Sequence, residues 1–246
     1  MITPKTIKLL RKKFTKSKII LYLYDSIKNL KGILGRVELY DRVISFDPLD
    51  CKNYGFDFRP LFCDLYSSEN KFPNIPVYDI CFYGTMYGDR LQIINCIKEK
   101  CQEQSLKFYS FCFLCGKFMS VYYLFTNKGY RLFDKRNISY IPKTLDEISN
   151  IVNKTKVVLD INSRKQTGLT IRTLETLVSG KKIITTNESI KEYDIYDSRN
   201  VLVLDRDRID EFIIPVEFIN SPFCALSSKV LYRYTVDGWI EDVFLK

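Results

Sequence analysis

The stretch that decides the fold is VVLDINSRKQTGLTIRTLETL, which runs from Val157 to Leu177. Its first part belongs to an apolar run, Lys156–Ile161, that indicates a buried strand. A polar loop with two basic residues and a glycine follows, and Leu169–Val178 then repeats its apolar residues at helical spacing. The stretch therefore predicts one strand–loop–helix unit of an α/β protein.

The same alternation of strands and helices extends on both sides of this stretch. Further strands are predicted at Asp79–Tyr83, Leu106–Leu114, Ile138–Ile141, Lys181–Thr186 and Asn200–Leu204. Further helices are predicted at Asp89–Gln104, Lys117–Thr126 and Thr144–Val152, where Thr144 and Glu147 have the spacing of a capping box, and Gly180 is predicted to cap the helix that ends at Val178. Repeated strand–helix units with apolar strands predict a Rossmann-like parallel sheet covered on both faces.

The two ends of the chain have a different pattern. Thr3–Phe14 predicts a basic helix, and three extended segments are predicted at Ile19–Tyr24, Arg42–Phe46 and Phe56–Phe62. The loop composition of Tyr66–Pro76 predicts a boundary, and helical spacing predicts a C-terminal helix from about Phe223. We therefore expect residues 1–75 to form a partial N-terminal α/β region, residues 76–222 the Rossmann-like domain, and residues 223–246 a C-terminal helix that packs back on the domains.

The composition excludes several classes of protein. With 46% hydrophobic residues in 246, the chain can bury a core, so a mainly disordered protein is excluded. Histidine is absent, which excludes every mechanism built on a histidine base or a histidine-containing metal site.

The eight cysteines lie mostly in apolar runs, which favours reduced core thiols. Cys112 and Cys115 also have metal or dithiol spacing, but no second such pair is present.

The charge of the chain indicates an anionic partner. Lys and Arg number 38 against 29 Asp and Glu, a formal net charge of +9. Nucleic acid, an anionic membrane surface and a phosphorylated small molecule all fit this excess.

Thr3–Phe14 is predicted to be a solvated helix, with a membrane-surface helix as the alternative. Ile19–Tyr24 is too short to span a membrane and no secretory cleavage site follows the basic N-terminus, so we expect a cytoplasmic protein.

Two loops lie where ligands bind in open α/β sheets, beyond the carboxyl ends of the strands. In the first, Gly84 is predicted to end a strand and let a ligand approach the backbone beside Thr85, while Arg90 meets an anion from the first helical turn. Ordinary turn chemistry is the alternative for Gly84. The loop contains neither GxGxxG nor the Gly-Lys-Ser/Thr ending of a Walker loop, so the usual dinucleotide and NTPase fingerprints are absent.

The second loop and its helix present a gap, a cation and a carboxylate on one edge. Gly168, Arg172 and Glu175 fall within about 60° of one another around the helix. Lys165, Arg172 and the free N–H groups of the helix N-terminus suit a diphosphate, and Glu175 suits paired sugar hydroxyls. A surface pair between Arg172 and Glu175 is the alternative interpretation.

These motifs resemble a known family. Lys156–Asn187 carries GLTIRTLE from Gly168 and GKKIITTN from Gly180, and it is similar to the C-terminal domain of GT-B glycosyltransferases, above all the bacterial enzymes of lipopolysaccharide and capsule biosynthesis. The resemblance extends from about Tyr78 to the helix with Trp239, and more weakly back to Ile19. It implies neither a cofactor nor a bound metal. The candidate donor contacts are Gly84, Thr85, Arg90, Lys165, Thr167, Gly168, Leu169, Arg172 and Glu175.

The resemblance implies a glycosyltransferase that moves a sugar from a nucleotide-diphosphate-sugar donor to a growing surface polysaccharide or a lipid-linked oligosaccharide. The reaction would take place at the inner face of the cell membrane, with possible peripheral contact of the protein, and Arg172 and Lys165 would stabilise the departing diphosphate. Asp205–Asp207 has the spacing of a metal-binding acidic triplet, but it follows a strand and we interpret it as a loop. Nucleic acid is not expected as a partner, because the aromatic residues lie in strands and the basic residues are dispersed.

The N-terminal region departs from the family pattern. Only about 75 residues precede the predicted boundary, whereas GT-B enzymes have two Rossmann-like domains. The alternatives to a complete enzyme are a truncated chain, a subunit whose partner chain supplies the missing half, and an inactive remnant that only binds a nucleotide sugar. Asp25, at the end of Ile19–Tyr24, is the candidate general base, with a turn or capping role as the alternative.

Overall fold

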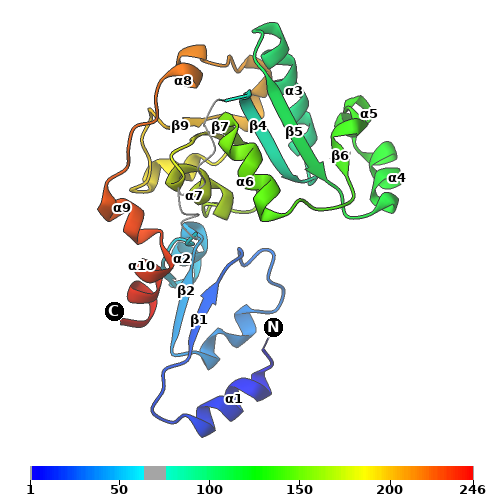
Figure 1. Cartoon of the computed structure of the whole chain (residues 1–246). Coiled ribbons are helices and arrows are strands. Elements are labelled where there is room, and N and C mark those ends of the chain that lie inside the picture. The colour runs from blue at the N-terminus through cyan, green and yellow to red at the C-terminus, as the bar shows by residue number, and fades with distance from the viewer. Residues whose placement is uncertain (1, 64–75, 246) are drawn as a thin grey trace. The chain divides into compact units, whose positions relative to one another are not determined.

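The computed structural model describes residues 2–63 and 76–245 (Figure 1). They divide into two compact units, one formed by Met1–Asp64, Ser163–Leu174 and Ser228–Lys246, the other by Leu65–Asn162 and Glu175–Ser227. Ser163–Leu174 and the C-terminal residues thus group with the N-terminal residues, which differs from the three consecutive parts that the sequence predicts. Most of the boundary predicted at Tyr66–Pro76 lies outside the described residues.

Within the described residues, the second unit is built on a six-stranded sheet in which every neighbouring pair is parallel. In spatial order its strands are β6 (Ile138–Ser139), β5 (Phe108–Phe113), β4 (Tyr78–Thr85), β7 (Thr155–Asp160), β8 (Lys182–Thr185) and β9 (Val201–Val203). The parallel sheet confirms the Rossmann-like α/β prediction. Each of the six predicted strands is present, with ends that shift by a few residues.

Helices cover both faces of this sheet. The helices of the unit are α3 (Arg90–Glu103), α4 (Lys117–Thr126), α5 (Lys128–Leu132), α6 (Leu145–Asn153), α8 (Val216–Asn220) and the second half of α7 (Ile171–Val178). Along β4, Ile80 and Phe82 belong to the cluster that includes the buried face of α3, whereas Cys81 and Tyr83 pack with Ile151 of α6. Strand residues therefore alternate between two apolar layers, as a sheet buried on both sides requires.

Two predicted helix caps are confirmed. Thr144 and Glu147 form a complete capping box at the start of α6. Gly180 follows α7 with φ 73°, and its N–H donates to Leu177 O at 3.1 Å while Lys181 N–H donates to Thr176 O at 3.0 Å. Glycine suits this position because the left-handed backbone carries no Cβ penalty there.

The first unit contains a smaller parallel sheet of β1 (Ile20–Leu23), β2 (Arg42–Ser45) and β3 (Asp57–Phe58). Its helices are α1 (Pro4–Lys13), the 3₁₀ helix Leu34–Leu39, α2 (Pro48–Tyr54) and the first half of α7. The sequence prediction missed α2, although Asp47 caps it and Pro48 occupies its first turn, which is a strong start signal. The extended segment predicted at Phe56–Phe62 is shorter in the structure, because only β3 pairs there.

The C-terminal residues form three short helical pieces, and the prediction of one continuous helix is wrong. The pieces are α9 (Ser228–Arg233), α10 (Val236–Ile240) and a π-helical turn, Glu241–Leu245. Thr235 interrupts the helix, because its side chain accepts from Gly238 N–H at 3.1 Å and starts α10 anew. Within the first unit these pieces pack on the strands: the Trp239 ring lies 4.9 Å from the Tyr22 ring, and Arg59 Nε lies 2.8 Å from Asp242 Oδ2.

All eight cysteines lie among the described residues, and none is in a disulfide. Burial raises the pKa of the Cys112 thiol to about 12, while Cys115 is exposed on the loop that follows β5. In the described part of the chain no three His, Cys, Asp or Glu side chains are placed to hold a metal ion. Over the same residues, no helix combines the length and apolarity needed to cross a membrane.

Acid should destabilise the loop before β9. Arg199 donates to both carboxylate oxygens of Asp197 from its side chain and to Oδ1 from its backbone N–H, which lowers the pKa of Asp197 to about 2. A carboxylate with a lowered folded pKa stabilises the protein above the unfolded pKa, and this stabilisation disappears as the pH falls through the folded value. We expect the free energy of unfolding of the wild type to fall more steeply between about pH 4 and pH 2 than that of Asp197→Asn. Urea titrations at several pH values measure both slopes, and parallel slopes would contradict the assignment.

Candidate functional site

Among its described strands, the second unit has one point where the strand order reverses. From β4 the chain moves outwards to β5 and β6, and it then returns to β7 on the other side of β4 before moving to β8 and β9. The loops that leave the carboxyl ends of β4 and β7 therefore diverge to opposite sides. In open parallel sheets this is where ligands bind, so the carboxyl ends of β4 and β7 are the candidate site.

The loop after β4 begins later than the sequence predicts. Gly84 does not follow the strand; Gly84 and Thr85 are its last two residues and pair with Cys112 and Phe113 of β5. The sequence predicts a strand over Asp79–Tyr83 that Gly84 ends, and the structure extends this strand by two residues. Gly84 leaves the second-last position of β4 without a side chain, and Thr85, the last residue of the strand, is exposed.

Arg90 joins the two strands at the reversal. It is the first residue of α3, and its guanidinium donates to Thr85 O at the end of β4 and to Ile161 O just after β7, both at 2.9 Å. This position matches the prediction that Arg90 lies in the first helical turn, at the carboxyl edge of the sheet. Its hydrogen bonds fix the guanidinium in place, so the positive charge at this edge is preorganised.

Arg206 is a second cation at the same edge, and the sequence prediction missed it. It follows β9 and donates from Nη2 to Asp89 Oδ1 at 2.8 Å and to Asn162 O at 3.0 Å. Its side chain is only 10% exposed, and its Nε is buried without a hydrogen-bond partner among the residues that the structure describes. The available signal was its place directly after a predicted strand, the same criterion that selected Arg90.

A threonine and an asparagine fix the neighbouring strand ends. Thr186, just after β8, donates from Oγ1 to Asn162 Oδ1 at 2.7 Å and accepts from Asn162 N–H at 3.2 Å. Asn162 also supplies one of the carbonyls that hold Arg206. The ends of β4, β7, β8 and β9 are therefore linked by polar contacts. A rigid edge with two guanidinium groups and the N-terminus of α3 can bind a phosphorylated ligand.

The predicted contacts on the loop before α7 belong to the first unit. Thr167 donates its backbone N–H to Asp47 Oδ2 at 2.9 Å, and its hydroxyl donates to Asp47 Oδ1. Lys165 is exposed, whereas Leu169 is buried in the core of the unit. The helix starts at Ile171 and not at Leu169, because Thr170 Oγ1 accepts from Thr173 N–H at 3.2 Å and caps it.

Gly168 leaves space for Phe46 of the same unit, not for an open gap. A Cβ on Gly168 would lie 2.6 Å from two ring carbons of Phe46 and 2.8 Å from its carbonyl oxygen. The half-buried Arg172 and Glu175 lie one turn apart on α7, Arg172 in its first half and Glu175 in the half that belongs to the second unit. Gly84, Thr85, Arg90 and Glu175 therefore share a unit, and the remaining predicted donor contacts belong to the other.

Asp25 lies two residues beyond β1 and stabilises a turn. Its Oδ1 accepts from Ser26 N–H at 2.8 Å and from Asn29 Nδ2 at 2.9 Å. Two buried acids that the prediction missed, Asp47 and Asp50, follow β2. Asp50 Oδ2 accepts from Ile27 N–H at 2.8 Å, and burial raises its pKa. They could have been found as strand-end acids after Arg42–Phe46, as Asp25 was after Ile19–Tyr24.

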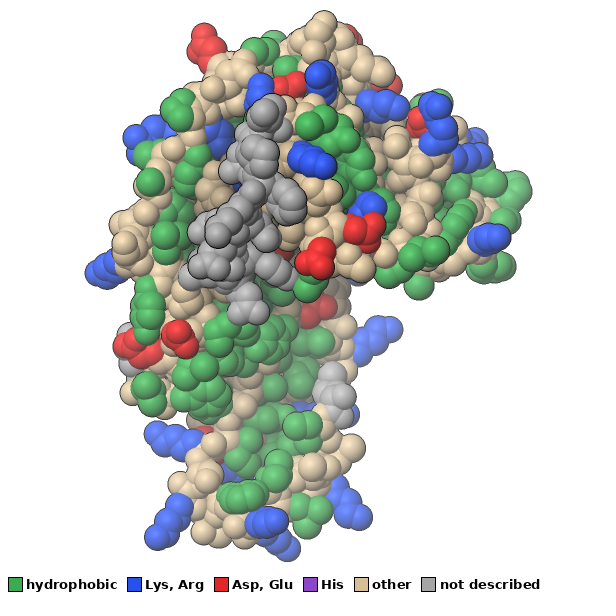
Figure 2. Space-filling model, viewed as in Figure 1, with side chains coloured by type: hydrophobic (Ala, Val, Ile, Leu, Met, Phe, Trp, Pro, Cys, Tyr) green, Lys and Arg blue, Asp and Glu red, His purple; other side chains and the backbone are tan. Residues whose placement is uncertain are grey.

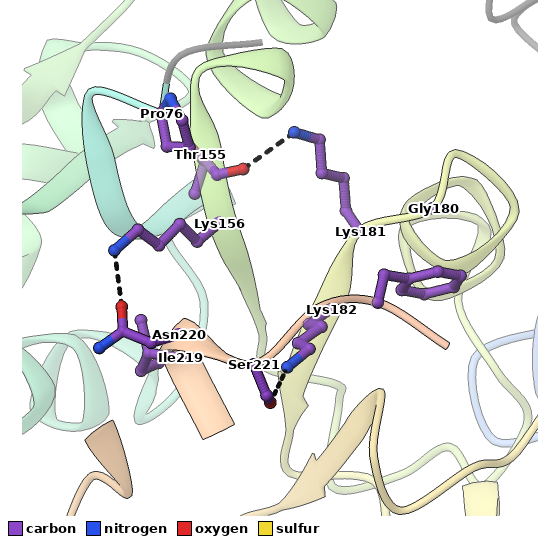
Figure 3. A pocket seen from close by; sticks show the side chains of 10 residues that line it. Pro76, Thr155, Lys156, Gly180, Lys181, Lys182, Ile219, Asn220 and Ser221 are labelled. Atoms are coloured by element: carbon purple, nitrogen blue, oxygen red, sulfur yellow. Dashed lines mark hydrogen bonds between the residues drawn. The ribbon is translucent and has the colours of Figure 1, made fainter. Parts of the chain in front are cut away.

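A pocket of about 260 Å³ lies at the opposite, amino-terminal ends of β7 and β8 (Figure 3). Three lysines point toward it, and each ammonium donates to protein acceptors. Lys181 donates to Asn153 O and Thr155 O, Lys182 to Phe218 O and Ser221 Oγ, and Lys156 contacts Asp79 and Asn220. Burial lowers the pKa of Lys181 and of Lys182. These contacts make the lysines parts of the structural frame around the sheet.

Comparison with known proteins gives the fold a name. No family model matches the sequence, and no curated protein matches it either. Among solved structures, the chain is similar to the lipopolysaccharide outer core galactosyltransferase WaaB, with a TM-score of 0.54 at 11% identity over 98% of this chain and 78% of that one. Anabaena HepE, solved in complex with UDP and glucose, gives 0.55 at 11% identity over 98% and 72%. The chain has the fold of GT-B glycosyltransferases.

A third similar structure is the N-terminal domain of trehalose-6-phosphate phosphatase from Candida albicans, with a TM-score of 0.58 at 12% identity. The match covers 96% of this chain and 66% of that one, so the chain spans slightly less than two thirds of its length. The low identities restrict these similarities to the fold. They agree with the GT-B resemblance that Lys156–Asn187 carries.

Proposed function

We propose that this chain is a glycosyltransferase that transfers a sugar from a nucleotide-diphosphate-sugar donor to a surface polysaccharide or a lipid-linked oligosaccharide. The observation that carries the proposal is the polar edge at the strand reversal, where Arg90 and Arg206 are held between the ends of β4, β7 and β9. This edge occurs in a fold shared with HepE, which was solved with UDP and glucose. An acceptor of the lipopolysaccharide or capsule type would place the protein at the inner face of the membrane.

In this proposal the diphosphate of the donor lies against the carboxyl edge of the second unit. Arg90, Arg206 and the N-terminus of α3 offset the negative charge that develops on the departing diphosphate. Because hydrogen bonds already fix both guanidinium groups, little reorganisation is needed during the reaction. Glu175, in the same unit, accepts hydrogen bonds from sugar hydroxyls. Lys165, Thr167, Gly168, Leu169 and Arg172 remain proposed donor contacts, and Asp25 the proposed general base.

A second candidate is a nucleotide-sugar-binding subunit that is inactive or depends on a partner chain. The observation that favours it is the small sheet of the first unit, which has three strands among the described residues against six in the second. In addition, Asp25 Oδ1 already accepts two hydrogen bonds within its own turn. Under this alternative the second unit binds the donor, and the acceptor side comes from another chain.

Calorimetric titration tests the donor edge. UDP, GDP, ADP and the corresponding nucleosides are titrated into the wild type, Arg206→Ala and the control Arg199→Ala, whose guanidinium is exposed on another loop of the same unit. We expect Arg206→Ala to weaken the preferred nucleoside diphosphate about tenfold, because it removes a charge-assisted contact, and to leave the nucleoside unaffected. Equal binding by the wild type and Arg206→Ala would contradict the assignment of Arg206.

Turnover separates the two candidate functions. Release of free sugar from the preferred nucleotide-diphosphate sugar is measured for the wild type and for Glu175→Ala. Turnover that is lost in Glu175→Ala while the nucleoside diphosphate still binds supports the transferase. Donor binding without turnover supports the subunit, and absence of any nucleotide binding contradicts both.

A further inference from the structure

Helix α4 has an exposed apolar face. Phe118 and Phe125 are 83% and 82% exposed, and Val121 and Tyr122 are each 53% exposed. These residues stand at positions i, i+3, i+4 and i+7, so they form one stripe along the helix. Figure 2 shows hydrophobic side chains gathered over the region that Figure 1 labels α4 and α5.

Other side chains of α4 attach the helix to the second unit, and the stripe stays exposed. Met119, Tyr123 and Leu124 are partly buried and pack against the core of the second unit. Ser120 Oγ lies 2.6 Å from Tyr140 OH, which ties the helix to the residues that follow β6. None of the ten residues of α4 is fully buried. The helix is therefore apolar on two faces, and the protein's own core covers only one of them.

The segment that carries this stripe is basic. The segment 117–143 has four lysines and two arginines but a single acidic residue, Asp134. Lys117 begins α4, Arg131 lies on α5, and both are exposed, as is Lys135 on the following turn. Arg136 forms an ion pair with Asp134. A stripe of Phe, Val and Tyr in a basic segment is complementary to the anionic headgroups and acyl chains of a lipid surface.

We propose that the α4 face, formed by Phe118, Val121, Tyr122 and Phe125 in this basic segment, docks this chain on an anionic membrane surface. The proposal deepens the proposed function, because a lipid-linked acceptor lies in such a membrane. Two exposed phenylalanines favour insertion between lipids over single-stranded RNA, which would need base-stacking rings beside a groove that tracks its backbone. The helix is ten residues long, which is too short to span a bilayer, so it would lie in the interface.

Sedimentation with vesicles tests the α4 face. The full chain is mixed with vesicles of phosphatidylcholine alone, or of equal parts phosphatidylcholine and phosphatidylglycerol. We expect binding to the anionic vesicles, and a loss of about tenfold or more in Phe118→Ser/Phe125→Ser, because both inserting side chains are removed. The matched control is Leu9→Ser/Phe14→Ser, which removes two exposed apolar side chains from another basic helix, one on α1 and one at its C-cap, and is expected to bind as the wild type does.

A second measurement distinguishes loss of membrane binding from loss of folding. In Phe125→Trp the new indole should show a blue-shifted emission and quenching by brominated phosphatidylglycerol, whereas Trp239 alone in the wild type should not. Binding that is unchanged in Phe118→Ser/Phe125→Ser, or lost only in the α1 control, overturns the proposal, as does preference for RNA over vesicles. Nucleotide titration of the same variants tests the donor site separately, so a failure of the proposed function is distinguishable from a failure of the docking surface.

Discussion

Gly168→Ala is expected to lower the free energy of unfolding of the first unit by about 3 kcal/mol. The new methyl group would lie 2.6 Å from the Phe46 ring and 2.8 Å from the Phe46 carbonyl oxygen. A ring can rotate away, but the carbonyl belongs to the backbone that leads from β2 into α2, so relief requires the main chain to move. Overpacking against backbone costs more than overpacking against a flexible side chain.

Denaturant titration followed by Trp239 fluorescence measures this loss, because the indole lies in the same unit. Gly35→Ala is the matched control: Gly35 also lies in the first unit, and a Cβ there would meet no atom within 4 Å. We expect the control to stay within about 0.5 kcal/mol of the wild type. If Gly168→Ala were equally stable, the space beside Gly168 would be open and its interpretation as a gap for the donor would gain support.

Asp47→Ala is expected to cost the first unit about 3 kcal/mol, since it leaves several donors without acceptors. The carboxylate is 1% exposed and accepts from the Thr167 N–H, the Thr167 hydroxyl and the Leu49 N–H. The substitution thus removes the N-cap of α2 and the anchor of the loop before α7 in one step. Asp47→Asn keeps one acceptor oxygen and should recover part of the loss.

The same fluorescence titration measures this series, with Asp57→Ala as the control. Asp57 also carries a carboxylate in the first unit, but it is largely exposed and its ion pair with Arg42 is at the surface. Such pairs contribute between zero and about 1 kcal/mol. A loss for Asp47→Ala no larger than that of Asp57→Ala would show that the buried carboxylate does not anchor the loop.

The fold could be predicted from the sequence where local signals and burial agree. The apolar run that ends at Ile161, the capping box at Thr144 and the glycine at position 180 each have a local physical cause, and the structure confirms them. The C-terminal helix was predicted as continuous because helical spacing persists through Thr235. The hydroxyl of Thr235 competes as a cap, and spacing alone does not weigh that competition.

The candidate site was predictable only in part. Arg90 was found because it follows a strand and a glycine in sequence. Arg206 also follows a predicted strand, but its partners Asp89 and Asn162 are distant in sequence and meet it only through the order of the strands. Gly168 was found but interpreted differently, since nothing in the sequence indicates that Phe46 fills the space beside it. Long-range partners of this kind cannot be read from spacing along the chain.

The discontinuous first unit has a consequence for how the chain folds during synthesis. Its three segments include residues 228–246, so it lacks a complete set of contacts until those residues have left the ribosome. The six described strands of the second unit have all been synthesised once β9 has emerged, so its sheet can form earlier. Domains generally fold as units in the order in which they are completed. Here β1, β2 and β3 must wait for residues 228–246, and their exposed edges in that interval are where misfolding would begin.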